Sequence, residues 1–84
     1  MNNFFHQRRI ELGKRAGKKI SQHKIAVAIG VTPNCVGLWE RGELIPNLKL
    51  AEKMAQAYQV SQDKIEQEIV KLARQINAPK LATA

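Results

Sequence analysis

The sequence contains little of what secreted, membrane-spanning or disulfide-stabilised proteins require. Its one cysteine, Cys35, has no second cysteine in the chain to pair with, so nothing indicates an oxidising compartment. The longest apolar run, residues 25–31, is much too short to cross a bilayer, and the N-terminus lacks the apolar segment of a signal peptide. We therefore expect a cytoplasmic protein that does not enter a membrane.

Side chains suited to catalysis are also scarce. The only two serines, Ser21 and Ser61, stand where they can cap helices, and the only aspartate is Asp63. His6 and His23 have no cysteine or carboxylate at metal-ligand spacing, and no glycine-rich phosphate loop is present. We therefore expect no enzymatic activity, no metal or other cofactor, and no small-molecule ligand.

Positive charge is what the chain has in excess. Its formal net charge is +7. A length of 84 residues suits one domain that folds without metals or disulfides. Residues 1–42 hold eight basic and two acidic side chains, whereas residues 43–84 hold six and five. A small domain with one strongly basic half is typical of proteins that bind the phosphate backbone of nucleic acids.

The basic half contains a pattern for two short helices. Ser21 can accept the free backbone N–H groups at the start of the first helix. Ile25, Ala26 and Ile29 mark its buried stripe, and Gly30 is suited to the left-handed conformation that ends a helix. A short turn containing glycine sets two helices at about 90–120° to each other.

The second of these helices has an equally clear start and end. Thr32 can cap it, and Pro33 fits the first helical position, where its missing N–H costs nothing. Val36 and Trp39 face inward, and Gly42 ends the helix. Together the two helices predict a helix-turn-helix motif over about residues 21–41.

The rest of the chain predicts an all-α fold, a compact five-helix bundle with an extended C-terminal helix. The first helix should cover about residues 3–12, closed by Gly13, and the basic segment 14–19 can be a loop or a frayed extension of that helix. Another helix should run from about residue 46 to residue 58. Phe5, Trp39 and Tyr58 are expected in the core.

The last helix should begin after Ser61 and carry an apolar seam. We predict a domain over residues 1–76 and a flexible tail over residues 77–84, because Pro79 is expected to stop the helix. The seam repeats at helical spacing, and its second half is predicted to contact another chain as a dimer interface. The interface candidates are Ile69, Leu72 and Ile76.

Several spaced motifs in residues 20–65 resemble the Cro and phage-repressor type of helix-turn-helix domain, the XRE family, and residues 8–13 resemble the end of its first helix. The resemblance is carried by Ser21-Gln22, Ala26, Gly30-Val31, Trp39-Glu40-Arg41-Gly42 and Pro46-Asn47-Leu48. The sequence departs from the family pattern in the insert at 14–19, in Lys24 where an acidic residue is common, and in Gln59 where glycine is usual.

The resemblance implies a set of functional positions. It implies that the helix of residues 32–41 enters the major groove of DNA and that dimers read half-sites about one helical turn apart. It also implies that Gln22 holds a phosphate and that Arg9 pairs with Glu40. Its base-reading positions correspond to Thr32, Pro33, Asn34, Gly37 and Leu38.

The chemistry of these residues leaves alternatives open. The amide of Asn34 suits adenine but can also help to cap its helix, and Leu38 can contact a thymine methyl or pack half-buried. Gly37 allows close approach of the backbone to DNA or is merely tolerated. Arg41 lies on the same outward face and is a further base-reading candidate. Cys35 can be a redox sensor or a small packing residue.

A second set of candidates concerns the phosphate backbone. Four basic side chains of the insert can grip phosphates or enter the minor groove, or they can simply be solvated. Gln22 can likewise be an ordinary exposed glutamine instead of a phosphate ligand. The four basic residues are Lys14, Arg15, Lys18 and Lys19.

These observations predict a sequence-specific regulator that binds double-stranded DNA as a homodimer, associates with the nucleoid when bound, and represses by occluding a promoter. Two alternatives stay open: a DNA-binding antitoxin whose last helix and tail dock a toxin, and a protein- or RNA-interaction adaptor that reuses the fold.

Overall fold

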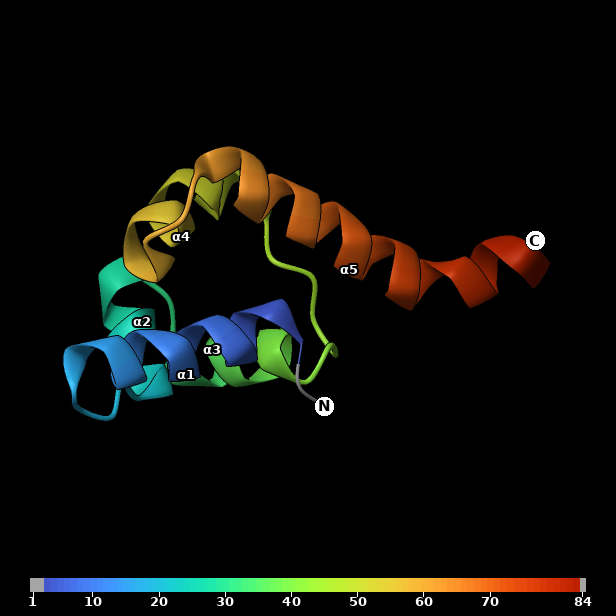
Figure 1. Cartoon of the computed structure of the whole chain (residues 1–84). Helices are drawn as coiled ribbons and strands as arrows, with labels where there is room; N and C mark the ends of the chain where they lie inside the picture. The colour runs from blue at the N-terminus through green and yellow to red at the C-terminus, as the bar shows by residue number, and fades with distance from the viewer. Residues whose placement is uncertain (1–2, 84) are drawn as a thin grey trace.

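The computed structural model describes the backbone of residues 3–83 and the side chains of residues 3–76. Within this range the chain forms five α-helices and one short 3₁₀ helix, with no strand, which confirms the predicted all-α fold (Figure 1). In chain order the elements are α1 (Phe4–Ala16), α2 (Gln22–Ile29), α3 (Pro33–Glu40), η1 (Leu48–Leu50), α4 (Ala51–Tyr58) and α5 (Gln62–Thr83).

One hydrophobic core joins all five α-helices. Each helix contributes the apolar side chains of one face, and Phe5, Trp39 and Tyr58 are almost fully buried in it, as predicted. The other members of the core are Ile25, Ala26, Ile29, Val36, Ala51, Met54, Ala55, Ile65, Ile69 and Leu72. The C-terminal turns of α5 extend away from the other helices (Figure 1).

The predicted helix caps are present. Oγ of Ser21 accepts a hydrogen bond from the backbone N–H of Lys24 at 3.1 Å, and Oγ1 of Thr32 accepts one from Cys35 at 3.3 Å. Ser61 caps α5 in the same way. Gly30 ends α2 with a φ of 92°, a left-handed conformation that glycine adopts without steric cost. Local sequence signals therefore fix the boundaries of the two central helices.

The first helix is longer than predicted, and the prediction that Gly13 closes it was wrong. α1 continues to Ala16, and Gly17 ends it in the left-handed conformation with a φ of 70°. A β-carbon on Gly13 would lie only 2.7 Å from the carbonyl oxygen of Lys18, so this glycine makes room for the returning chain. The basic segment 14–19 is accordingly helical in its first half and a turn in its second half.

The last helix also runs further than predicted. α5 continues through Pro79 to Thr83, so the expected stop before this proline was wrong. A proline inside a helix removes one backbone hydrogen bond and crowds the carbonyl four residues earlier, which can kink a helix without ending it. The side chains of residues 77–84 lie outside the described ones, and the division into a domain of residues 1–76 and a flexible tail stays a prediction.

The apolar seam of α5 faces the core of its own chain. Ile69 is 3% exposed and Leu72 5% exposed, and both belong to the core cluster, whereas Ile76 is partly buried against that cluster. Leu72 reaches Gly42, where an added β-carbon would lie 3.7 Å from its Cδ1. The prediction that this seam meets a second chain is therefore wrong for Ile69 and Leu72, because packing against α4 and the loop after α3 already covers them.

None of the helices in the described part of the chain is long and apolar enough to span a membrane.

Candidate nucleic-acid interface

The turn between α2 and α3 fixes the second helix relative to the first. The N–H groups of Gly30 and Val31 both donate to the carbonyl oxygen of Ala26, at 2.8 and 3.0 Å. Thr32 then caps α3, and Pro33 occupies its first position. With Val36 and Trp39 buried against the core, the turn leaves α3 only one orientation, with its opposite face toward solvent.

That outward face of α3 carries the predicted base-reading residues. Thr32, Pro33 and Asn34 are exposed at its start, and Arg41 is exposed immediately after its end. Leu38 is half-buried, which is compatible with both of its predicted roles. The side chain of Arg41 is held by Glu43, whose Oε2 accepts a hydrogen bond from Nε of Arg41 at 2.7 Å.

Gly37 differs from these residues because it is buried. A β-carbon at this position would lie 3.3 Å from Oε1 of Gln22 and 3.3 Å from Nη1 of Arg41. Gly37 therefore lies beneath two polar side chains, one from the start of α2 and one from the end of α3. This arrangement was not among the roles expected for Gly37 from the sequence.

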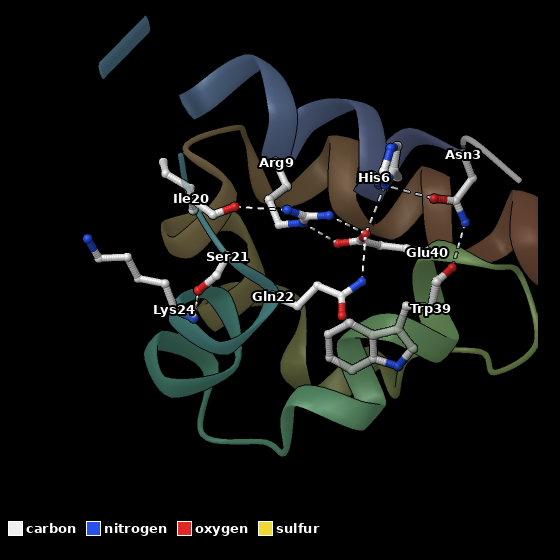
Figure 2. A network of polar contacts seen from close by, with 9 residues as sticks. All are labelled: Asn3, His6, Arg9, Ile20, Ser21, Gln22, Lys24, Trp39 and Glu40. Carbon is white, nitrogen blue, oxygen red and sulfur yellow. Dashed lines mark hydrogen bonds and ion pairs between the residues drawn. The ribbon is translucent and has the colours of Figure 1, made fainter. Parts of the chain in front are cut away.

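Gln22 is half-buried at the first position of α2, and its side chain turns toward α3. Its Nε2 donates to Oε1 of Glu40 at 3.1 Å (Figure 2). The amide is therefore held in place by the protein before any ligand arrives. An amide nitrogen has two hydrogens, so this bond still leaves one donor for a phosphate oxygen.

Arg9 and Glu40, which the resemblance pairs, are brought together in the interior. Nε and Nη2 of Arg9 donate to the two carboxylate oxygens of Glu40 at 2.7 and 2.9 Å, and Nη1 donates to the carbonyl oxygen of Ile20 at 2.8 Å. Arg9 is 7% exposed and Glu40 is 2% exposed. The pair connects α1 to α3 and to the segment that leads into α2.

Glu40 accepts further bonds from two residues for which the sequence indicated no such contact. Nδ1 of His6 lies 3.0 Å from Oε1 of Glu40, and because a carboxylate can only accept, the imidazole is the donor. Gln22 donates to the same oxygen (Figure 2). His6 lies three residues before Arg9 in α1, so the helical period could have indicated that both side chains share one face. Nothing in the sequence pairs Gln22 with Glu40.

The charges of this cluster support one another. Burial alone would favour the protonated form of Glu40, but hydrogen bonds from Arg9, Gln22 and His6, with the charge of Arg9, hold its pKa below the ordinary value. The hydrogen bond to Glu40 raises the pKa of Arg9 against the opposing effect of burial. Both groups are therefore charged, and the cluster fixes the start of α2 against the end of α3.

The four basic residues predicted to contact phosphates are all exposed. Lys14 and Arg15 lie in the last turn of α1, where Nη2 of Arg15 is 3.6 Å from Oε1 of Glu11. Lys18 and Lys19 lie in the turn that leads directly to Ser21. The second pair therefore adjoins the start of α2 and Gln22, whereas the first pair lies one turn further back.

Two helices joined by a short glycine turn, the first packed inward and the second presenting an outward face, define a helix-turn-helix protein. A family model described as helix-turn-helix matches residues 12–65, and the chain belongs to this family, which is of the Cro and phage-repressor type also called XRE. The family comprises DNA-binding regulators and is not a class of enzymes. No match was found among curated proteins or among solved structures.

Proposed function

We propose that this protein is a sequence-specific transcriptional repressor that binds operator DNA as a homodimer. In this proposal α3 lies in the major groove, Asn34 and Arg41 contact base edges, and Gln22 binds a phosphate. The same stretch of groove lies against Thr32, Pro33 and Leu38. The bound dimer acts by covering promoter DNA.

The observation that carries the proposal is the orientation of α3. Its inner side chains are locked in the core, while Thr32, Pro33 and Asn34 at its start are exposed. A rigid helix with one unpacked polar face suits the major groove, which is wide enough to admit an α-helix. Exposed Lys18 and Lys19 lie in the turn before α2, where they would follow the phosphate backbone and add affinity that falls with salt.

Dimerisation is proposed from the way in which such domains read DNA, since two copies related by two-fold symmetry match a palindromic site. Ile69 and Leu72 are not available for the contact, because they lie in the core of the monomer. Among the side chains of α5 that the structure describes, Val70 is the exposed large apolar one, at 43%, and Ile76 is only partly buried.

Selection of bound duplexes from a random pool, at near-physiological salt, tests this function. The proposal predicts recovery of a palindrome whose half-sites lie about one helical turn apart. Recovery of an asymmetric single site would retain DNA binding and contradict the dimer. Enrichment of no sequence, with only salt-sensitive bulk binding, would contradict sequence-specific repression.

A further inference from the structure

Two polar side chains meet above the one glycine in the middle of α3. The point that a β-carbon of Gly37 would occupy is 3.3 Å from Oε1 of Gln22, 3.7 Å from its Nε2, and 3.3 Å from Nη1 of Arg41. Few β-carbons in proteins have contacts as close as 3.3 Å. In their present positions, therefore, the amide and the guanidinium leave too little room for a side chain at residue 37.

Both side chains also donate a hydrogen bond to a carboxylate. Glu40 accepts a hydrogen bond from Nε2 of Gln22 at 3.1 Å, and Glu43 accepts one from Nε of Arg41 at 2.7 Å. Glu40 thus orders the amide of Gln22, and Glu43 restricts the rotamers of Arg41, whose side chain is half exposed. Ordering these donors in the free protein reduces the entropy lost when they bind a partner.

We propose that Gly37 is a positioning residue of the DNA interface, because its missing side chain lets Gln22 and Arg41 lie across α3 in the orientation that contacts DNA. This inference rests on the proposed function and deepens it. Gly37 makes no base contact of its own in this account. It acts through two donors that flank the outward face, one suited to a phosphate and the other to a phosphate or a guanine edge.

The inference explains a glycine that is otherwise unfavourable where it stands. In the interior of a helix, glycine is less favourable than alanine. Gly37 has no positive φ, so its backbone conformation does not require glycine. The nearest atoms that alanine at residue 37 would meet are the ends of two flexible side chains, so the fold can accommodate the methyl group by moving them. DNA affinity is therefore expected to fall without a loss of stability.

The variant Gly37→Ala tests the inference, with Gln67→Ala on the exposed surface of α5 as the control. Gly37→Ala should melt at the same or a higher temperature than the wild type. In ¹⁵N spectra of the free protein, the side-chain amide resonances of Gln22 should shift, since its contact with Glu40 is disturbed. Affinity for the most enriched duplex of the random pool should fall about tenfold, whereas Gln67→Ala should change none of the three.

A double-mutant cycle shows whether Gly37 acts through its neighbours. In a Gln22→Ala, Arg41→Ala background, the added methyl group should have little further effect on affinity. A full tenfold loss in that background would overturn the inference, since the backbone of Gly37 would then contact DNA directly. Unchanged affinity in Gly37→Ala alone would also overturn it.

The two proposals fail in different ways. If the wild type enriches no duplex, the proposed function fails, and the inference fails with it. If the wild type binds its selected duplex and Gly37→Ala binds equally well, with unshifted Gln22 resonances, only the positioning role of Gly37 is lost.

Discussion

At the scale of single residues, Glu40 connects the folding of this domain to its candidate interface. Its carboxylate lies at the end of α3 and accepts hydrogen bonds from α1 through Arg9 and His6, and from α2 through Gln22. A buried carboxylate is costly unless it is paired and fully hydrogen-bonded, and here both oxygens are used. The same bonds that keep Glu40 charged also orient Gln22.

Removal of Arg9 should therefore be strongly destabilising. Arg9→Met leaves the buried charge of Glu40 without its main partner, so we expect the free energy of unfolding to fall by about 3–5 kcal/mol. Urea denaturation followed by circular dichroism measures this change. Arg15→Met is the matched control, because Arg15 is largely exposed and should contribute less than about 1 kcal/mol. Equal effects of the two variants would contradict the role given to the buried pair.

The low pKa of Glu40 predicts the direction of the pH dependence. The folded protein holds this pKa below its ordinary value of 4.5, so the unfolded state binds the proton more readily. The contribution of Glu40 to stability is thus complete above about pH 4.5 and is lost as the pH falls through the lower, folded pKa. In Glu40→Gln, which is less stable at neutral pH, stability should decline less steeply with acid. An identical acid slope in both proteins would show that Glu40 has no shifted pKa.

At the level of helices and turns, the connection from α1 to α2 depends on Gly13, which the sequence predicted to end the first helix. Gly13 lies within α1 and permits the chain to return across it, and Lys18 donates its N–H to the Gly13 carbonyl oxygen at 3.0 Å. Alanine in a helix interior is normally favoured over glycine by about 1 kcal/mol. Here the methyl group would meet backbone at 2.7 Å, which cannot move aside like a flexible side chain.

Gly13→Ala should consequently destabilise the protein by about 1–3 kcal/mol, the range expected for overpacking. Gly37→Ala provides the comparison, because the nearest atoms to its methyl group are side-chain ends, and it should leave stability unchanged or higher. Chemical denaturation of both variants measures the difference. A stabilised Gly13→Ala protein would mean that the turn of residues 17–20 does not lie against α1.

Two adjacent positions of α5 test which face of this helix is buried. Ile69 is 3% exposed in the core, whereas Val70, the next residue along the helix, is 43% exposed. Ile69→Glu should unfold the domain, since it places an unpaired charge among apolar side chains, and Val70→Glu should leave the melting temperature nearly unchanged. Thermal denaturation by circular dichroism separates the two. Folded Ile69→Glu protein would restore the seam as a surface between chains.

The sequence predicts the central elements of this fold better than its ends, for local reasons. Ser21, Gly30 and Thr32 cap helices through contacts with near neighbours in the chain, so their roles follow from spacing alone. The role of Gly13 depends on how the turn after α1 folds back against it, and that of Leu72 on a segment distant in the sequence, and the sequence misassigned both. An apolar seam indicates a buried face, but it does not say whether the chain itself or a second copy covers that face.

At the scale of the whole molecule, the charge asymmetry and the fold agree. The basic half of the chain forms α1, α2 and α3, and its exposed Lys18 and Lys19 adjoin the start of α2. The candidate positions on α3 follow from the family resemblance and from helical spacing. The hydrogen bonds that Gln22 donates to Glu40 and Arg41 donates to Glu43 require coordinates, because no helical period pairs these residues. The helical period does place Arg41 one turn after Gly37, but it does not show that Gln22 crowds the same point.

We propose that the outward face of α3 reads a DNA sequence, and a ratio of two affinities tests this. The measurement compares binding of the selected duplex with that of a scrambled duplex of equal length, at one salt concentration, for the wild type and for Asn34→Ala. We expect a strong preference for the selected duplex in the wild type and a preference reduced by about 1–3 kcal/mol in Asn34→Ala, with little change in binding of the scrambled duplex. Equal binding of both duplexes by the wild type, or an unaltered preference in Asn34→Ala, would contradict it.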